Sequence, residues 1–251
     1  MEYPKIQTIF KRDSNNIIIP NSYTKEEFQW LKDCKFRAEE KIDGTNIRIE
    51  LHILDDGSVV HSFEGRTGRA VIPVHLLEKL NVLFPSDKLR EVFGEYIGSH
   101  ITLYGEGYGH KIQGGGGYIP NDVNFILFDV KVDNWWLTRE AVEQIAEALS
   151  IDVVPIIGYM TIGEACEFVA NGFTSRIAQD PNLIAEGLVL KTPFNLLMRD
   201  GERIVLKVKN VDFRKWKEKY GSNNIHFDHF VGGEVKITTD IIQPINEKYK
   251  E

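Results

Sequence analysis

The chain has 251 residues and a formal net charge of −7, with 42% hydrophobic and 11% aromatic residues. This apolar content is enough for a packed core and excludes global disorder, while the length allows one large domain or two small ones. The acidic balance argues against a protein that coats nucleic-acid phosphates, although basic residues could still gather in one cleft. No apolar run is long enough to cross a membrane and the first residues lack a secretory pattern, so we expect a cytoplasmic protein without a membrane partner.

Cysteine and histidine give no sign of a metal centre. The chain has two cysteines, Cys34 and Cys166, and no CxxC or Cys/His cluster. We expect both thiols to be small, buried, hydrophobic side chains in a reducing compartment. The seven histidines show no ligand spacing such as HxxxH on a helix, so none is assigned to a metal.

The first half of the chain contains one helix signal and one strong strand signal. Thr24 to Glu27 has the pattern of a capping box, which predicts a short helix through about Leu31. From Ile47 to Ile53, apolar residues alternate with polar ones, as in a half-buried strand. Asp55 to Gly57 predicts the turn that follows it.

Helix and strand signals then follow one another without a regular βαβ order. Apolar residues at helical spacing predict a helix over 138–149, and a second capping box at Thr161 to Glu164 predicts a helix that Gly172 ends. Because the strands cluster towards both ends of the chain, we predict an α+β protein with mainly antiparallel sheets. The remaining predicted strands are Phe125–Val130, Gly187–Leu190 and Ile204–Val208.

Four consecutive glycines, Gly114 to Gly117, follow another glycine-rich stretch at 105–109. Glycine-rich loops can cradle phosphates, but this one has no Walker lysine and does not join a strand to a helix. We therefore interpret it as a mobile loop beside an active site.

The segment with the clearest chemical content is Glu39-Glu40-Lys41-Ile-Asp-Gly-Thr-Asn46. A lysine is a poor nucleophile at its ordinary pKa of about 10.4, but among other cations in a pocket it can lose its proton and attack an electrophile. Alone, Lys-x-Asp-Gly is a weak pattern, and a solvated lysine before a turn is the simpler explanation.

Five further motifs follow Lys41–Asn46 in a fixed order, and the series resembles the covalent nucleotidyltransferase superfamily of polynucleotide ligases and mRNA capping enzymes. Within it, the Gly-Thr-Asn ending is most similar to phage-type, ATP-dependent RNA ligases of the nick-sealing branch. The five motifs are Gly65–Gly68, Tyr104–Gly107, Phe125–Val130, Glu186–Lys191 and Leu206–Lys209.

The resemblance implies an antiparallel-sheet nucleotidyltransferase (adenylyltransferase) domain of the ATP-grasp-like ligase type, expected over residues 1–210. Most relatives append an OB-fold, but only about 40 residues remain after Lys209, too few for a comfortable independent fold. We expect residues 211–251 to be a short C-terminal extension packed on the same domain. Phe213, Trp216 and Tyr220 have a spacing that favours packing on the body over contact with nucleic acid.

The implied reaction has three steps: Lys41 attacks ATP, AMP passes to an RNA 5′-phosphate, and a 3′-hydroxyl displaces AMP. Lys207 and Lys209 lie two apart in a strand and therefore on one face, where they can neutralise the α-phosphate and favour the uncharged form of Lys41. Glu186 is the expected ligand of Mg²⁺ or Mn²⁺. These residues form the expected catalytic set: Lys41, Lys207, Lys209 and Glu186.

A second set is expected to bind the nucleotide. Phe128 would stack on adenine, and Glu40 would accept a hydrogen bond from the adenine amino group, although Phe128 also fits a core position and Glu39 adjoins Glu40. Arg66 suits phosphate or ribose, with Arg69 as the alternative. The full set is Glu40, Asn46, Arg66, Glu106, Phe128 and Lys191.

The expected partners are RNA ends, in a nicked duplex or a broken tRNA-type strand, and an accessory RNA-binding partner could supply additional grip. A DNA ligase or capping enzyme is the nearest alternative, and the Gly-Thr-Asn ending disfavours both. A non-catalytic relic of the fold, binding nucleotide or RNA, is the alternative of another class. The presence of all the ionisable motif residues argues against a relic; they are Lys41, Glu106, Glu186, Lys207 and Lys209.

Overall fold

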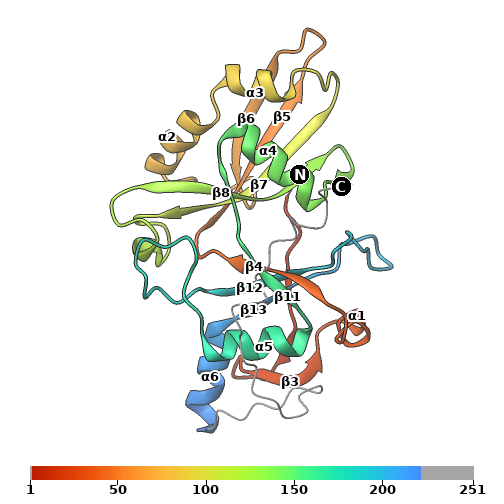
Figure 1. The fold of residues 1–251 in the computed structure, drawn as a ribbon, viewed down its shortest axis with the longest axis vertical. Helices are drawn as coiled ribbons and strands as arrows, with labels where there is room; N and C mark the ends of the chain where they lie inside the picture. Colours follow the sequence, from red (N-terminus) through yellow and green to blue (C-terminus); the bar gives the residue numbers. More distant parts are fainter. Residues whose placement is uncertain (1, 222–251) are drawn as a thin grey trace, which may run out of the picture.

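The computed structural model describes residues 2–221, and the account of the fold is limited to them. Two antiparallel-rich sheets form the upper and lower parts of the molecule in Figure 1. The lower sheet has the order β1-β13-β12-β4-β11, and the upper sheet has the order β10-β8-β7-β5-β6 with β9 on β8. The lower strands are β1 (Gln7–Thr8), β4 (Phe36–Lys41), β11 (Ile156–Met160), β12 (Gly187–Lys191) and β13 (Val205–Lys209). The upper strands are β5 (Thr45–Ile53), β6 (Val59–Gly65), β7 (His100–Gly109), β8 (Val123–Val132), β9 (Trp135–Trp136) and β10 (Asp152–Val153).

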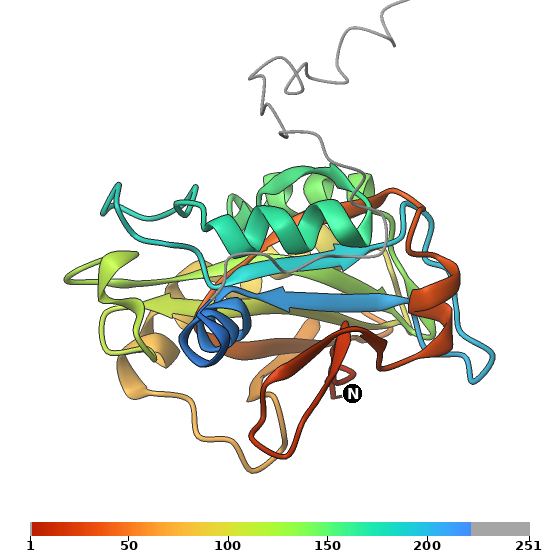
Figure 2. The ribbon, with the colours of Figure 1, turned by 90° about the horizontal axis from the view of Figure 1, so that it is seen from below.

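Each sheet buries one face beneath helices and keeps the other face polar. Figure 2 shows α5 (Ile162–Asn171) along β12 and β13, and its buried side packs on Leu188, Leu190 and Leu206. A two-stranded ribbon completes this lower core. The other elements are β2 (Phe10–Arg12), β3 (Ile18–Tyr23), α1 (Glu26–Trp30), α2 (Val74–Leu83), α3 (Ser86–Phe93), α4 (Arg139–Leu149), a 3₁₀ turn at Gly115–Gly117 and α6 (Asn210–Tyr220).

Alternation along β5 explains the upper core. Ile47, Ile49 and Leu51 are fully buried with side chains of α2, α3 and α4, while the residues between them face the opposite side of the sheet. The polar faces of the two sheets therefore point inward, towards a shared cleft that the cavity described below occupies.

The predicted α+β class with antiparallel sheets is confirmed, with parallel pairing only at β1–β13 and β8–β10 among the described strands. The predicted helices at 138–149 and 161–172 are present. Thr161 and Glu164 form the predicted capping box, and Gly172 caps the end. No helix in the described part of the chain has the length and apolar character needed to span a membrane.

Two local predictions were wrong. Thr24 does not cap α1, which begins at Glu26, because its hydroxyl donates instead to the carbonyl oxygen of Thr8. Cys34 is exposed because it lies in the turn after α1, outside both sheets; only Cys166 is buried. Helices α2 and α3, which cover the upper sheet, were not predicted from the sequence.

Helix α6 packs on the lower sheet through aromatic side chains, as their spacing predicts. Phe213 is buried and Trp216 is half-buried against the same core, while Tyr220 is half-exposed and lies 4.3 Å from the Trp216 ring. The rest of the expected C-terminal extension lies outside the described residues.

Candidate active site

The site is built on adjacent rows of the lower sheet. Gly187 pairs with Lys41 on one side and with Lys209 on the other, so these three residues form one row across β4, β12 and β13. Val189 pairs in the same way with Glu39 and Lys207. Since directly paired residues share a face, both rows present their side chains to the cleft between the sheets.

Glu186 joins the two lysines of the first row. Its Oε2 atom lies 2.5 Å from Lys41 Nζ, and its Oε1 atom lies 2.5 Å from Lys209 Nζ. All three side chains are only partly exposed, so the carboxylate sits between two cations that are shielded from bulk water. The arrangement fixes the Lys41 amine and places a proton acceptor against it.

A cavity of about 330 Å³ opens beside Lys41, between the polar faces of the two sheets. Lys41 lies at its floor with Lys207, and Asn46 and Glu106, which pair across β5 and β7, line the opposite wall. Glu186 lines a second cavity of about 260 Å³ together with Asp43 and Arg214. The residues assigned from the sequence that line the first cavity are Glu40, Lys41, Asn46, Arg66, Glu106, Phe128, Lys191 and Lys207.

Two ionisable groups in the site have strongly shifted pKa values. Burial and the nearby cations Lys209, Lys41 and Arg66 together lower the pKa of Lys207 to about 8, against the effect of Glu186. Burial, with the charges of Glu186 and Asp43, raises the pKa of Glu106 to about 8, and Lys41 and Arg66 oppose this rise. Perturbed groups in a cleft are typical of functional sites.

Phe128 points into the cavity because of a bulge in β8. Asp129 pairs with Tyr104 and Leu127 pairs with Gly105, so Phe128 is the extra residue at this step of the ladder. The ring is half-buried and meets the ring of Tyr3 edge-on, with centroids 5.1 Å apart. The bulge therefore places the flat apolar ring of Phe128 at the cavity wall, whereas a regular strand would direct this side chain differently.

Lys191 lines the cavity, but its ammonium group is already engaged. Its Nζ atom lies 2.8 Å from Glu39 Oε2, 3.2 Å from Asp129 Oδ2 and 2.8 Å from the Phe128 carbonyl oxygen. The side chain is only 3% exposed. This geometry suits a residue that holds the Phe128 segment in place better than one that contacts the nucleotide.

The Glu40 carboxylate is held by hydrogen bonds from two residues that do not line the cavity. One of its oxygens accepts from the Ser175 hydroxyl at 2.5 Å and the other from the Arg176 backbone N–H at 2.8 Å. Burial raises the pKa of the Glu40 carboxyl against these two hydrogen bonds. Arg66 is exposed at the rim of the cavity, whereas Arg69 does not line it.

Several lining residues were not found from the sequence. Tyr3, Pro4 and Ile6 come from the segment before the first strand, where no motif marked them. Val189 could have been found, because it alternates with Lys191 on the strand that follows Glu186. Val154 and Gln113 lie outside every motif, and only the folded chain brings them to the cavity.

Glu186 is the carboxylate in contact with Lys41 that could hold a divalent cation. Asp43 and Glu186 raise the pKa of Glu106, and burial followed by Glu186 raises the pKa of Asp43, so the three groups lie within electrostatic reach of one another. Oxygen donors of this kind fit Mg²⁺ or Mn²⁺.

Two antiparallel sheets that enclose a nucleotide-sized cavity, with a lysine row on one wall, define the nucleotidyltransferase class of fold. Residues 35–209, most of the chain, match the RNA ligase family. The chain belongs to that family. No curated protein matches it in sequence.

The fold is similar to that of the Naegleria gruberi RNA ligase solved with PPi, with a TM-score of 0.55, 20% identity and coverage of 87% of this chain and 64% of that one. A variant of that ligase with ATP and Mn matches with a TM-score of 0.54 and 20% identity, over 85% of this chain and 59% of that one. A variant with AMP and Mn matches with a TM-score of 0.52 and 20% identity, over 84% of this chain and 63% of that one. At this identity the likeness shows the fold alone, and the chain spans about three-fifths of the length of these relatives.

Proposed function

We propose that this protein is an ATP-dependent RNA ligase that forms a covalent lysyl-AMP intermediate on Lys41. The observation that carries the proposal is the position of Lys41 Nζ, 2.5 Å from Glu186 and at the floor of a cavity that also holds Lys207. Membership of the RNA ligase family supports it, as do structures of Naegleria relatives with ATP, AMP, PPi and Mn.

In the first step, Lys41 Nζ forms a bond to the α-phosphorus of ATP while the bond from that phosphorus to the pyrophosphate oxygen breaks. The Lys41 ammonium must first lose a proton, and Glu186 Oε2 is the nearest acceptor. Lys207 and Lys209 neutralise charge on the phosphate, so the work of the site is positioning and electrostatic stabilisation.

In the later steps, a 5′-phosphate oxygen of RNA takes AMP from Lys41, and a 3′-hydroxyl then displaces AMP to form the phosphodiester. Glu186 would hold Mg²⁺ or Mn²⁺, which would supply charge neutralisation at the phosphates. Phe128 and Glu40 would contact adenine, and Arg66 and Asn46 would contact phosphate or the RNA end.

The substrate that fits this proposal is a pair of RNA ends, in a nicked duplex or a broken tRNA-type strand, as expected in RNA repair in the cytoplasm. The formal charge of −7 leaves little general attraction for RNA. An accessory RNA-binding partner would supply the missing grip.

The test is sealing of a 5′-phosphorylated RNA nick with ATP and Mg²⁺, with a DNA nick and GTP as the parallel arms. Wild type is expected to seal RNA with ATP, whereas Lys41→Ala is expected to be inactive. Lys35→Ala is the matched control, because Lys35 forms an exposed ion pair with Glu164 outside the cavity. Preference for DNA, preference for GTP, or sealing by Lys41→Ala would each overturn the proposal.

A further inference from the structure

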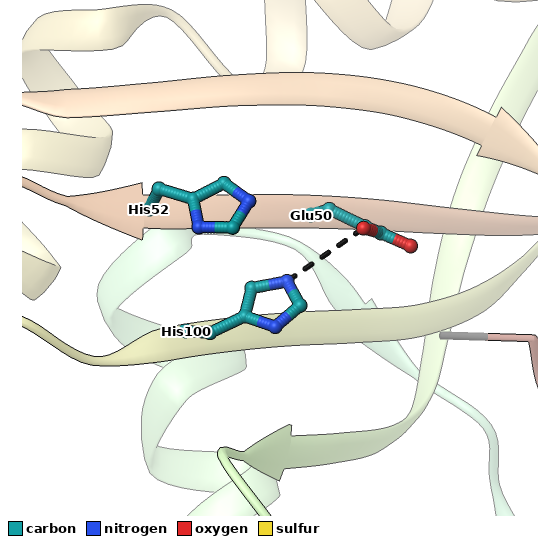
Figure 3. Close-up of side chains that lie close together, drawn as sticks. All are labelled: Glu50, His52 and His100. Carbon is teal, nitrogen blue, oxygen red and sulfur yellow. Dashed lines mark ion pairs between the residues drawn. The ribbon is translucent and has the colours of Figure 1, made fainter.

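A cluster of three metal-ligating side chains lies on the upper sheet. Glu50 and His52 project from β5, and His100 projects from the start of β7, as Figure 3 shows. His52 lies directly opposite His100 in the antiparallel register, so both side chains leave the same face of the sheet. One potential ligand atom from each of the three residues lies within 4.8 Å of the other two.

The cluster is separate from the proposed ligase site. Asn46, on the same face of β5, lines the cavity, but neither histidine does. Since a strand rises by about 3.3 Å per residue, the step from Asn46 to His52 is on the order of 20 Å. The carboxylates around Lys41 therefore cannot share a cation with this cluster.

The geometry of His100 points to a ligand. Its Nε2 atom is buried and has no hydrogen-bond partner in the part of the chain that the structure describes, although Glu50 Oε2 lies 3.6 Å away. A buried polar atom without a partner is costly, and it calls for an explanation such as an ion. A metal bound to Nε2 and to the Glu50 carboxylate would give this nitrogen a partner.

The two imidazole rings are stacked, with centroids 4.4 Å apart and an angle of 1° between their planes. A neutral imidazole has the lone pair that a metal needs. Because each nitrogen lone pair lies in the plane of its ring, the His52 ring must turn out of this parallel arrangement before both rings can bind one ion.

We propose that Glu50, His52 and His100 bind a zinc-class divalent cation that ties β5 to β7. Two imidazoles and one carboxylate suit Zn²⁺ and do not suit Mg²⁺, which prefers oxygen ligands. Bonds of about 2.0–2.2 Å require the ligand atoms to close to about 3.5 Å, and His52, which is exposed, can rotate to do so. Arg48 Nε lies 3.3 Å from Glu50 Oε1, and His100 Nε2 lies 3.6 Å from Glu50 Oε2.

The cation would act as a clamp and take no part in the ligase chemistry. Strands β5 and β7 carry Asn46 and Glu106 to the cavity at their other ends, so a tie between them stiffens one wall of the nucleotide site. The proposal does not depend on the ligase activity, because zinc binding is measured on the protein alone.

The test uses the full chain, stripped of metal and held in millimolar Mg²⁺ so that the oxygen-rich site prefers Mg²⁺. Zinc affinity is measured by competition with a chromogenic chelator in the wild type, His52→Ala and His100→Ala. His61→Ala is the matched control, because His61 lies on the neighbouring strand β6 opposite the core residue Leu51. Zinc bound elsewhere on the chain is common to all four proteins, so only differences between them count.

We expect one zinc site in the wild type and in His61→Ala that weakens at least 100-fold in His52→Ala and His100→Ala. Zinc should also raise the Tm of the wild type and leave that of His52→Ala unchanged, and this exposed position allows the variant to fold. Equal zinc affinity in all four proteins, or no zinc bound by the wild type, would overturn the proposal.

Discussion

At the scale of single residues, the site is governed by what burial does to charge. Glu106 and Lys207 both have a pKa of about 8, the first raised and the second lowered, mainly because each is removed from water. Their protonation states therefore change just above neutral pH, where both the stability of the fold and the rate of the first step respond.

We predict that Glu106→Gln stabilises the protein at pH 9. The folded-state pKa of Glu106 is raised from 4.5 to about 8, so its contribution to stability is present below pH 4.5 and is lost as the pH rises through about 8. Since one pKa unit corresponds to about 1.4 kcal/mol, we expect a gain of at least ~1 kcal/mol at pH 9 and little change at pH 4. Urea unfolding at both pH values checks this, and an equal change at both would contradict it.

Lys207 is predicted to make the first step sensitive to alkaline pH. Above about pH 8 its ammonium loses the proton and the site loses a cation, whereas an arginine stays charged. The ratio of the adenylylation rate of Lys207→Arg to that of the wild type should therefore rise above pH 8. Lys207→Ala should be about 10²-fold slower at pH 7, by analogy with loss of one stabilising group at a developing charge. A ratio that is flat with pH would rule out this role.

At the scale of elements, the row Lys41–Gly187–Lys209 depends on how closely β12 approaches β13. Gly187 has φ +153°, and a Cβ atom there would lie 1.9 Å from the Val208 carbonyl oxygen. Only glycine allows the carboxylate that precedes it, Glu186, to reach both lysines.

We therefore predict that Gly187→Ala costs about 2–5 kcal/mol of stability through backbone strain and overpacking, and lowers the adenylylation rate at least tenfold. Gly68→Ala is the control, because no atom lies within 4 Å of a Cβ built there. Thermal unfolding and the rate of adenylylation measure the two effects. Equal Tm values for the two variants would show that the close approach is not needed.

Local patterns were enough to predict elements whose signal lies within their own segment. The Thr161 capping box and the alternation of β5 are examples. Thr24 shows where local patterns fail. Its hydroxyl donates to the distant carbonyl oxygen of Thr8, an interaction that no local pattern reveals. Helices α2 and α3 lack a side-chain cap that would have marked their starts.

At the scale of the whole molecule, a buried ionic network joins the two sheets. Asp129, on β8, accepts from Arg203 at 2.9 Å and from the Tyr3 hydroxyl at 2.5 Å, and Lys191 on β12 lies 3.2 Å from the same carboxylate. Lys191 continues the network to Glu39 on β4. The cavity lies at this junction, so the network fixes the distance between its walls.

We predict that Asp129→Asn destabilises the protein by about 3–5 kcal/mol, because Lys191 and Arg203 would become buried charges without a full counter-charge. The cations Lys191 and Arg203 and hydrogen bonds from Arg203 and Tyr3 hold the pKa of Asp129 below its ordinary value of 3.8, against the effect of burial. Its stabilisation is therefore present above pH 4 and is lost as the pH falls further. Urea unfolding at pH 7 and pH 3 tests this: the difference between variant and wild type should shrink at pH 3, and a constant difference would contradict it.

The motif series predicted eight of the residues that line the cavity, because each motif supplies a side chain at the end or face of a strand. The motifs could not predict which of those side chains already form ion pairs or hydrogen bonds with other residues of the folded chain. Lys191 has three partners and Glu40 has two, and these come from segments far away in the sequence. The histidine pair at 52 and 100 was missed for the same reason, since only the sheet register brings these residues together.

The most direct measurement is the intact mass of the protein after incubation with ATP and Mg²⁺, for the wild type, Lys41→Ala and Lys35→Ala. The proposed mechanism predicts a gain of one AMP in the wild type and in Lys35→Ala, lost again when 5′-phosphorylated RNA is added, and no gain in Lys41→Ala. A folded wild type that gains no AMP, or a Lys41→Ala variant that does, would contradict it.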